Sequence, residues 1–216
     1  MEEIKGQSLS TSVFERIEQG ILTGEYPVGT VLTENGLSKE LQVSRTPIRE
    51  AISRLLQENL VKETAKGHVV TGVSKSDIVD IYDIRLKIEG VATARCARII
   101  SDEKLKALEE VVDLQEFYTQ KGEADRIKSL DGDFHQTIYA NCGSEIYCSI
   151  LTALHKKAQK FRKQSVSVSE RAKQVAAEHR EILNALKSRD EALAEAIAVK
   201  HVNNAKISII GSDVLP

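Results

Sequence analysis

The chain has 216 residues, 41% of them hydrophobic and 29% charged, and its formal net charge is −2. This is the composition of an ordinary soluble globular protein of one large domain or two small ones, without the basic excess typical of nucleic-acid binders. No apolar run approaches the roughly 20 residues that span a bilayer, so no membrane association is expected. The N-terminus does not resemble a targeting peptide, and Cys96, Cys142 and Cys148 cannot all pair with one another, which favours the reduced cytoplasm.

The first part of the chain contains three predicted helices. Apolar side chains recur at helical spacing over residues 9–23, and this helix is predicted to end at Gly24. A second helix is predicted over residues 34–41, with Thr33 as its N-cap. After a tight connection, a third helix is predicted over residues 43–56, where apolar side chains fall on one side and polar side chains on the other.

The polar side of the third predicted helix carries arginines. Arg45 lies at its start, and Thr46 and Arg49 fall opposite the apolar stripe. Over residues 44–54 three arginines accompany a single glutamate (3 − 1), a local charge of +2, whereas residues 1–73 carry 8 basic and 10 acidic residues (8 − 10), or −2. Such a helix is often only solvated surface. A nucleic-acid binder built on it would depend on a small, well-placed patch rather than on its overall field.

Two short strands are predicted after the third helix. They span residues 60–64 and 68–71 and are joined by Ala65-Lys66-Gly67, so the hairpin has a glycine at its tip. Three helices followed by a two-stranded hairpin form a winged helix-turn-helix, the arrangement that lays its third helix in the major groove of DNA. We therefore assign residues 1–73 to a DNA-binding domain.

These segments resemble the N-terminal domain of GntR-type bacterial transcription regulators. The resemblance covers about residues 9–73 and rests on the segments Gly20–Gly24, Pro27–Glu34, Leu37–Ala51 and Leu55–Val61. It implies operator contacts by Arg45, Thr46 and Arg49, and a wing tip that reaches the minor groove with Lys66, Gly67 and His68. Asn35 departs from the family pattern, because several relatives carry an arginine there, and this puts one of the expected contacts in doubt.

Beyond a short linker at Val73–Asp77, the chain is predicted to be helical throughout. Six helices are expected, at about residues 76–99, 103–121, 123–141, 144–164, 168–188 and 190–209. Six antiparallel helices form a bundle whose interior can hold a site. The predicted fold class is therefore mainly α, with a winged helix-turn-helix over residues 1–73 and an antiparallel helical bundle over residues 74–216.

Three of the five histidines fall where helices can bring them together with a carboxylate. Asp131 and His135 are four residues apart, so both project from one face of a helix. His179 lies about ten residues before the turn at residues 188–190, and His201 lies about twelve after it. At a rise of about 1.5 Å per residue, these two histidines lie at nearly the same height on neighbouring antiparallel helices. One aspartate and three histidines complete a ligand set for a divalent transition metal.

The ligand types favour Zn²⁺, Ni²⁺, Mn²⁺ or Fe²⁺ over Ca²⁺ or Mg²⁺, and an octahedral metal would keep one or two open positions. The competing interpretation is that each histidine is a surface or capping residue, since Asp–His pairs four residues apart are common on exposed helices. His68 and His155 do not fit the set and are expected on the surface. Glu178 and Asp133, which are near the candidate ligands in sequence, are also expected on helix surfaces.

The second part of the chain resembles the effector-binding domain of the FadR-like (FCD) branch of GntR regulators. The resemblance spans about residues 76–209 and rests on Tyr82–Glu89, Leu130–His135, Glu178–Leu183 and His201. In members that contain a metal the ligands are one Asp and three His, which implies the ligands Asp131, His135, His179 and His201. Ser144 stands where the family usually carries Asn, so a contact near the pocket is in doubt.

Arg85 lies in a stripe of residues that faces the bundle, and a buried guanidinium needs a partner. One option is an internal ion pair with Glu89, one helical turn further on. The other is a clamp for a ligand carboxylate, which suits the forked geometry of arginine. The resemblance implies an effector-binding role, because the matching arginine is implicated in holding acidic effectors. A metal with open positions beside one arginine would suit a small hydroxy or dicarboxylic acid.

These observations predict a cytoplasmic, homodimeric transcription regulator. A small carboxylate effector bound near the metal would modulate binding to a double-stranded, palindromic DNA operator. Two alternatives stay open: a metal-dependent hydrolase-like enzyme, in which the same ligands activate a water, and a regulator that senses the metal itself. No convincing general base or nucleophile accompanies the ligand set, so an enzyme is the less favoured interpretation.

Overall fold

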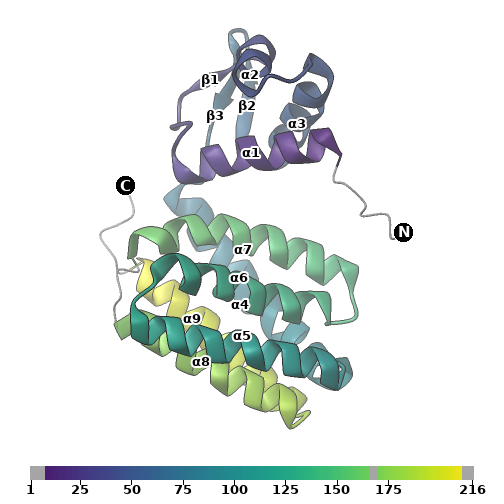
Figure 1. Cartoon of the computed structure of the whole chain (residues 1–216), viewed down its shortest axis with the longest axis vertical. Helices are drawn as coiled ribbons and strands as arrows, with labels where there is room; N and C mark the ends of the chain where they lie inside the picture. Colours follow the sequence, from purple (N-terminus) through teal and green to yellow (C-terminus); the bar gives the residue numbers. More distant parts are fainter. Residues whose placement is uncertain (1–7, 166–169, 211–216) are drawn as a thin grey trace. The chain divides into compact units, whose positions relative to one another are not determined.

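The computed structural model describes residues 8–165 and 170–210 of the chain (Figure 1). Contacts within the chain divide it into two compact units, Met1–Ser74 and Lys75–Pro216. The first unit combines helices with a small sheet, and the second is built from helices over the residues that the structure describes. The described residues are thus mainly helical, with one small antiparallel sheet in the first unit, so the fold class predicted from the sequence is confirmed.

Three helices form most of the first unit: α1 (Leu9–Thr23), α2 (Glu34–Leu41) and α3 (Arg45–Gln57). α1 ends at Gly24, whose φ of 83° is the left-handed conformation that glycine adopts at little cost. The side chain of Thr33 caps α2 by accepting a hydrogen bond from the backbone N–H of Gly36. These ends agree with the sequence predictions because short-range capping chemistry determines them.

A three-stranded antiparallel sheet completes the first unit, with strand order β1-β3-β2. The hairpin strands are β2 (Val61–Thr64) and β3 (Gly67–Val70), as predicted, and β1 (Val31–Leu32) adds a strand that the sequence did not predict. Two residues are too few to show the alternation by which a strand is recognised. A Cβ on Gly67 would lie 2.8 Å from the carbonyl oxygen of Leu32, so the contact between β1 and the hairpin requires glycine there.

The core of the first unit lies between α1, α3 and the sheet. α1 contributes Val13, Phe14, Ile17 and Ile21, and α3 contributes Ile48, Ala51, Ile52 and Leu55. The other buried members of the cluster are Tyr26, Leu32, Leu37, Leu60, Val61 and Val70. Ile48, Ala51 and Leu55 are fully buried, which leaves the opposite face of α3 to solvent. The amphipathic pattern of α3 therefore fixes which of its side chains are presented outward.

Six helices form the second unit over the residues described there. They are α4 (Lys75–Ile99), α5 (Asp102–Lys121), α6 (Ala124–Ala140), α7 (Glu145–Ser165), α8 (Glu170–Lys187) and α9 (Glu191–Ile210). Each lies within two residues of its predicted bounds where the chain is described; the predicted start of α8 at residue 168 lies outside the described residues. None of the helices searched combines the length and the apolar character needed to cross a bilayer.

α4 and α9 approach closely at Gly90, which has no side chain. α4 packs along α9, where a Cβ on Gly90 would lie 2.7 Å from Cγ2 of Val199. α5 packs against both α6 and α8, and α7 packs against α6 and α4. The apolar core includes Cys96, Leu108, Val112, Phe134, Ile138, Tyr139, Leu151, Ile182, Leu183 and Leu186. One end of this core gives way to a group of buried polar side chains, which is the candidate site.

Candidate metal centre and nucleic-acid interface

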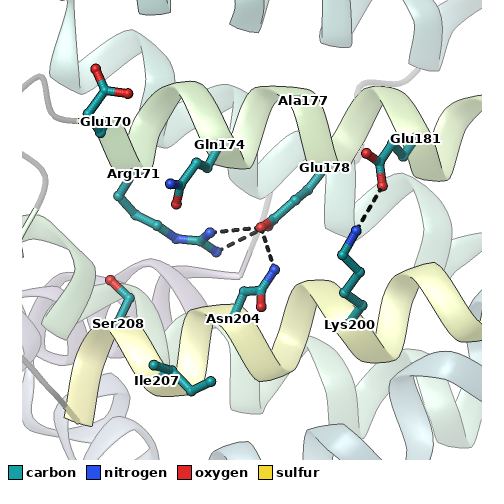
Figure 2. A pocket seen from close by; sticks show the side chains of 10 residues that line it. All are labelled: Glu170, Arg171, Gln174, Ala177, Glu178, Glu181, Lys200, Asn204, Ile207 and Ser208. Atoms are coloured by element: carbon teal, nitrogen blue, oxygen red, sulfur yellow. Dashed lines mark hydrogen bonds and ion pairs between the residues drawn. The ribbon is translucent and has the colours of Figure 1, made fainter.

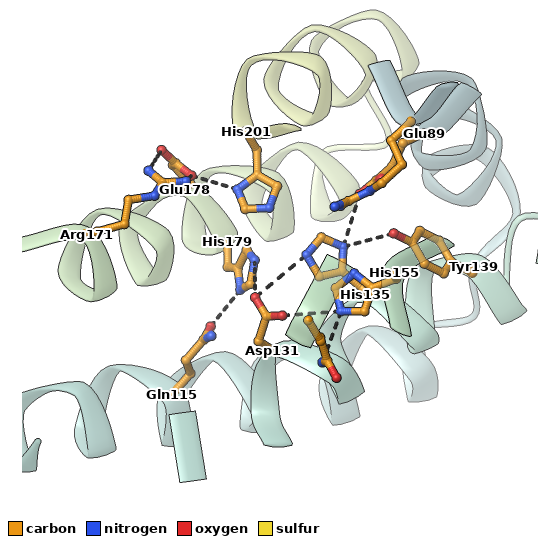
Figure 3. A network of polar contacts seen from close by, with 12 residues as sticks. Glu89, Gln115, Asp131, His135, Tyr139, His155, Arg171, Glu178, His179 and His201 are labelled. Atoms are coloured by element: carbon orange, nitrogen blue, oxygen red, sulfur yellow. Dashed lines mark hydrogen bonds and ion pairs between the residues drawn. The ribbon is translucent and has the colours of Figure 1, made fainter. Parts of the chain in front are cut away.

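Three helices bring the four predicted ligands together inside the bundle (Figure 3). Asp131 and His135 come from α6, His179 from α8 and His201 from α9, and all four are buried, with exposed fractions between 0% and 6%. One nitrogen of each histidine lies within 4.8 Å of the others. Oδ1 of Asp131 lies 3.9 Å from Nε2 of His135 and 3.9 Å from Nε2 of His179. The structure thus places one carboxylate and three imidazoles around a common centre.

The rings of His179 and His201 are held by hydrogen bonds on their outer nitrogens. Nδ1 of His179 lies 2.7 Å from Oε1 of Gln115, and Nδ1 of His201 lies 2.7 Å from Oε2 of Glu178. The ring of Phe134 stacks on that of His179, with a centroid distance of 3.9 Å. A hydrogen bond on Nδ1 places the proton there and makes Nε2 the basic nitrogen, the arrangement typical of metal-binding histidines.

His135 has the same arrangement on the other side of the centre. Its Nδ1 lies 3.2 Å from Oε1 of Glu89 and 3.3 Å from the hydroxyl of Tyr139. Its Nε2 is buried and has no hydrogen-bond partner within residues 8–165 and 170–210. Burial and then the neighbouring His155 lower the pKa of His135 to about 4, although Glu89 and Asp131 oppose this shift. The imidazole is therefore neutral at pH 7, the form that binds a metal.

The donor set fits a divalent transition metal. Three neutral imidazole nitrogens and one carboxylate oxygen are the ligand types that Zn²⁺, Ni²⁺, Mn²⁺ and Fe²⁺ accept. The buried Nε2 of His135, directed toward the centre, would otherwise bear an uncompensated desolvation cost. The outer hydrogen bonds from Gln115, Glu178 and Glu89 supply the second layer of contacts that such a centre needs.

Glu178 is buried, which corrects the sequence expectation of a surface residue. It is 8% exposed and lies on the cleft between α8 and α9, where Arg171 donates two hydrogen bonds of 2.8 and 3.1 Å to it and Asn204 donates one of 2.8 Å (Figure 2). Burial raises the pKa of Glu178, but hydrogen bonds from His201, Arg171 and Asn204 outweigh it and lower the pKa to about 2. Glu178 is thus a charged acceptor for His201, whereas Asp133 is exposed as expected.

His155 is also buried, and the expectation that it lies on the surface was wrong. Its exposed fraction is 5%, its Nε2 lies 3.3 Å from Oδ2 of Asp131, and its ring centroid lies 4.4 Å from that of His135. Leu151 and Ala158, at helical spacing on either side, are fully buried, so this stripe of α7 faces inward. The stripe was the sequence signal that could have placed His155 in the site. His68 is half-buried in β3 of the first unit.

Arg85 forms the internal ion pair that was one of its two predicted options. Its side chain is fully buried, and Nε and Nη2 donate to the Glu89 carboxylate at 2.7 and 3.1 Å. Burial opposes the charge of Arg85, but Glu89 raises the pKa of the guanidinium well above its ordinary value. Nη1 is buried and has no hydrogen-bond partner in the described part of the chain. The N–H groups of this nitrogen can therefore donate to a further acceptor. Glu89 links Arg85 to His135, because the same carboxylate that accepts from Arg85 also contacts Nδ1 of His135.

The outward face of α3 presents the three residues that the sequence singled out. Arg45, Thr46 and Arg49 are all exposed. The guanidinium of Arg49 meets the carboxylate of Glu34 through hydrogen bonds of 3.0 and 3.1 Å, and the Arg49 side chain stays 70% exposed. Ser44 stands at the N-cap of α3 but makes no side-chain capping bond among the residues described, so the orphan N–H groups there are open to an anion.

The wing lies near the same acidic residue. Lys66 is exposed at the hairpin tip, and Gly67 and His68 are half-buried at the start of β3. The hydrogen bond from Arg49 lowers the pKa of Glu34, with further contributions from the charges of Arg49, Arg45 and His68. Glu34 therefore lies within electrostatic range of side chains from both α3 and the wing. Arg54 differs from the other arginines, because it covers the Phe14 ring at 3.8 Å and joins α3 to α1.

A winged helix-turn-helix followed by a helical bundle with a buried polar site is the architecture of a bacterial transcription regulator. Residues 9–68 match the family described as "Bacterial regulatory proteins, gntR family", and residues 80–204, more than half of the chain, match the FCD domain. The chain therefore belongs to the GntR regulators that carry an FCD domain. The gntR family and the two curated relatives below are transcription regulators, not enzymes.

The gluconate operon transcriptional repressor of Bacillus licheniformis is 36% identical over 118 residues, which cover 55% of this chain and 49% of that protein. The repressor of the same name from Bacillus subtilis (strain 168) is 31% identical over 131 residues, 61% of this chain and 54% of that protein. The chain thus spans about half the length of these curated relatives. The solved structure of E. coli McbR/YncC shares the fold, with a TM-score of 0.80 over 95% of this chain and 99% of that chain, at 21% identity.

Proposed function

We propose that this chain is a homodimeric, cytoplasmic DNA-binding regulator whose bundle holds a divalent transition metal and binds a small carboxylate effector beside it. The observation that carries the proposal is the convergence of Asp131, His135, His179 and His201 on one buried centre, in the same chain as a winged helix-turn-helix. A DNA-binding unit alone has no use for a buried set of four metal ligands. Such a set indicates a second binding site, and a ligand bound there can change the affinity of the chain for DNA.

Each protein residue around the metal has a defined task in this proposal. Asp131 and the Nε2 atoms of the three histidines would hold Zn²⁺, Ni²⁺, Mn²⁺ or Fe²⁺, and the bound ion would supply a Lewis-acid position for an effector oxygen. Gln115 and Glu178 fix the orientation of the His179 and His201 rings through their Nδ1 atoms. Because all four ligands are buried, water has little access and charges there interact strongly.

A small hydroxy or dicarboxylic acid is the effector class that we propose. Arg85 has one buried guanidinium nitrogen, Nη1, beyond the two that bind Glu89, and this nitrogen is a donor for a carboxylate. A hydroxyl or second carboxylate could then complete an open position on the metal. Two relatives are named as gluconate operon repressors, and gluconate is itself a hydroxy acid, so it is the first compound to test.

Operator recognition is assigned to α3 and the wing. Arg45, Thr46 and Arg49 would contact the major groove, and Lys66, Gly67 and His68 would reach the adjacent minor groove. Residues 1–73 carry a net charge of −2 (8 − 10), so one unit has little long-range attraction for DNA. Tight binding would therefore need two units on a palindromic operator, which is the reason for proposing a homodimer.

A thermal-shift screen of small carboxylic acids, run with and without a chelator, tests this proposal. The expected result is that gluconate or a related acid raises the melting temperature of the full chain and that chelation removes the effect. Stabilisation that survives complete removal of the metal would contradict a metal-dependent effector site. Equilibrium dialysis separates effector sensing from metal sensing, because a metal sensor must exchange metal over the concentrations at which its DNA affinity changes.

A further inference from the structure

His155 lies against the one candidate ligand that is not a histidine. Oδ1 of Asp131 lies 3.9 Å from the Nε2 atoms of both His135 and His179, whereas Oδ2 lies 3.3 Å from Nε2 of His155. The two oxygens of one carboxylate thus have different neighbours (Figure 3). One oxygen is directed toward the three-histidine centre, and the other is directed toward α7.

The packing of α6 on α7 keeps His155 in this position. Gly132 follows Asp131 on α6, and a Cβ there would lie 3.1 Å from Nε2 of Gln159, so the absence of a side chain allows the two helices to approach closely. A hydrogen bond of 2.9 Å between Thr152 and Gln136 joins the same two helices further along. His155 lies between these two contacts on the inner stripe of α7, with 5% of its surface exposed.

The amide of Gln159 also lies near His155, 3.2 Å from the same ring nitrogen that meets Asp131. The two ends of a glutamine amide have nearly the same shape, and the hydrogen-bond network decides which end faces a partner. With a proton on Nε2 of His155, the amide oxygen of Gln159 faces the ring. The Nε2–H group then lies between two oxygen acceptors, of which the Asp131 carboxylate is the charged and therefore stronger one.

We propose that His155 is a positioning residue of the metal centre, which donates from Nε2 to Oδ2 of Asp131 and so keeps Oδ1 directed at the metal. The inference rests on the proposed function, because it requires the metal that Asp131 would bind. A carboxylate without such a partner can rotate, or can bind through both oxygens and occupy a further position on the metal. Holding Oδ2 restricts Asp131 to one metal bond and preserves an open position for the effector.

Two substitutions separate this role from simple packing. His155→Gln keeps an N–H donor at nearly the distance of Nε2 from the backbone, whereas His155→Leu fills the space without a donor. Zn²⁺ affinity of the full chain would be measured for both by competition with a chromophoric chelator. We expect His155→Leu to weaken Zn²⁺ binding by about 10- to 100-fold and His155→Gln to restore most of the affinity, as is usual for residues that orient a metal ligand. Circular dichroism and thermal unfolding of the metal-free proteins provide the control for folding.

The outcomes distinguish this inference from the proposal on which it rests. Unchanged Zn²⁺ affinity in His155→Leu, together with a large loss in His179→Ala, would overturn the positioning role and leave the metal site in place. A crystal structure of the Zn²⁺-loaded protein with a His155 nitrogen at about 2.0–2.1 Å from the metal would also overturn it, because His155 would then be a ligand. A wild-type protein that binds no divalent metal would overturn the proposed function and this inference with it.

Discussion

The two units of this chain each contain an arginine that meets a glutamate through two hydrogen bonds, in opposite surroundings. In the first unit Arg49 pairs with Glu34, and their side chains are 70% and 31% exposed. In the bundle Arg85 pairs with Glu89, and their side chains are 0% and 3% exposed. The bonds have similar lengths, so their geometry alone would suggest the same role.

Solvent gives these two pairs different roles. Water and salt screen the exposed pair, so it contributes little to stability and a DNA phosphate or base can replace Glu34 at Arg49. The buried pair has no such substitute, because removing either partner leaves a charge in a medium of low polarity. An exchangeable ion pair suits a surface that must bind and release, and a permanent one suits a scaffold that must hold His135 in place.

Breaking the buried pair should have the largest effect on folding. Glu89→Ala leaves the guanidinium of Arg85 without its carboxylate and removes the acceptor of Nδ1 of His135. We expect the free energy of unfolding of the metal-free protein to fall by about 3–5 kcal/mol, measured by urea denaturation. The double variant Arg85→Met with Glu89→Leu is the matched control and should recover most of the loss. A loss below about 1 kcal/mol in Glu89→Ala would show that the pair is not dehydrated as described.

Removing a predicted ligand should abolish metal binding without unfolding the first unit. His179→Ala deletes a fully buried imidazole whose Nδ1 is bound to Gln115. We expect the purified variant to retain no stoichiometric transition metal by elemental analysis, whereas wild type retains about one ion per chain. His68, half-buried in β3 of the other unit, supplies the control, since His68→Ala should leave the metal content unchanged. Equal metal contents in wild type and His179→Ala would exclude the site.

Breaking the exposed pair from the arginine side should impair DNA binding alone. Arg49→Ala removes a side chain that contributes nothing to the core of the unit, so folding, metal content and dimerisation should be unchanged. Specific operator affinity, measured by fluorescence anisotropy, should fall by roughly tenfold or more. Arg54→Ala provides a contrast, because Arg54 covers Phe14 and its loss should destabilise the unit. Loss of the dimer in Arg49→Ala would mean that Arg49 belongs to an interface between subunits.

Breaking the same pair from the glutamate side should have the smallest effect and the opposite sign. Glu34→Gln removes the acid that competes with DNA for Arg49, and its charge also acts on Arg45 and His68. We expect DNA affinity to rise about two- to threefold at low salt and the gain to shrink at high salt. Weaker binding in Glu34→Gln would show instead that the glutamate orients Arg49 for its contact.

The first unit was largely predictable from sequence because local chemistry determines its elements. Thr33 marks the start of α2 through a side-chain hydrogen bond to a residue three positions further on. Gly24 marks the end of α1 and Gly67 marks the tip of the wing, because both adopt a positive φ. β1 escaped prediction because its two residues are defined only by pairing with β3, more than thirty residues further on.

The bundle site was predictable where helix geometry sufficed and unpredictable where packing between helices decides. Asp131 and His135 share one helical face, and His179 and His201 share one height across a turn, so spacing alone brought them together. Glu178 was assigned to the surface because sequence gives no direct account of which helix packs against its side of α8. His155 was assigned to the surface although Leu151 and Ala158 mark its stripe of α7 as apolar. Burial by α6 and α9 makes these two residues part of the site.

Control of DNA binding by an effector bound at the metal can be measured directly. The affinity of the full chain for its own upstream DNA would be measured with and without a carboxylic acid that stabilises the metal-loaded protein, in wild type and in His179→Ala. We expect the acid to change the wild-type affinity by about 5- to 150-fold, in either direction, and to leave the affinity of His179→Ala unchanged. An equal change in both proteins, or none in wild type, would contradict it.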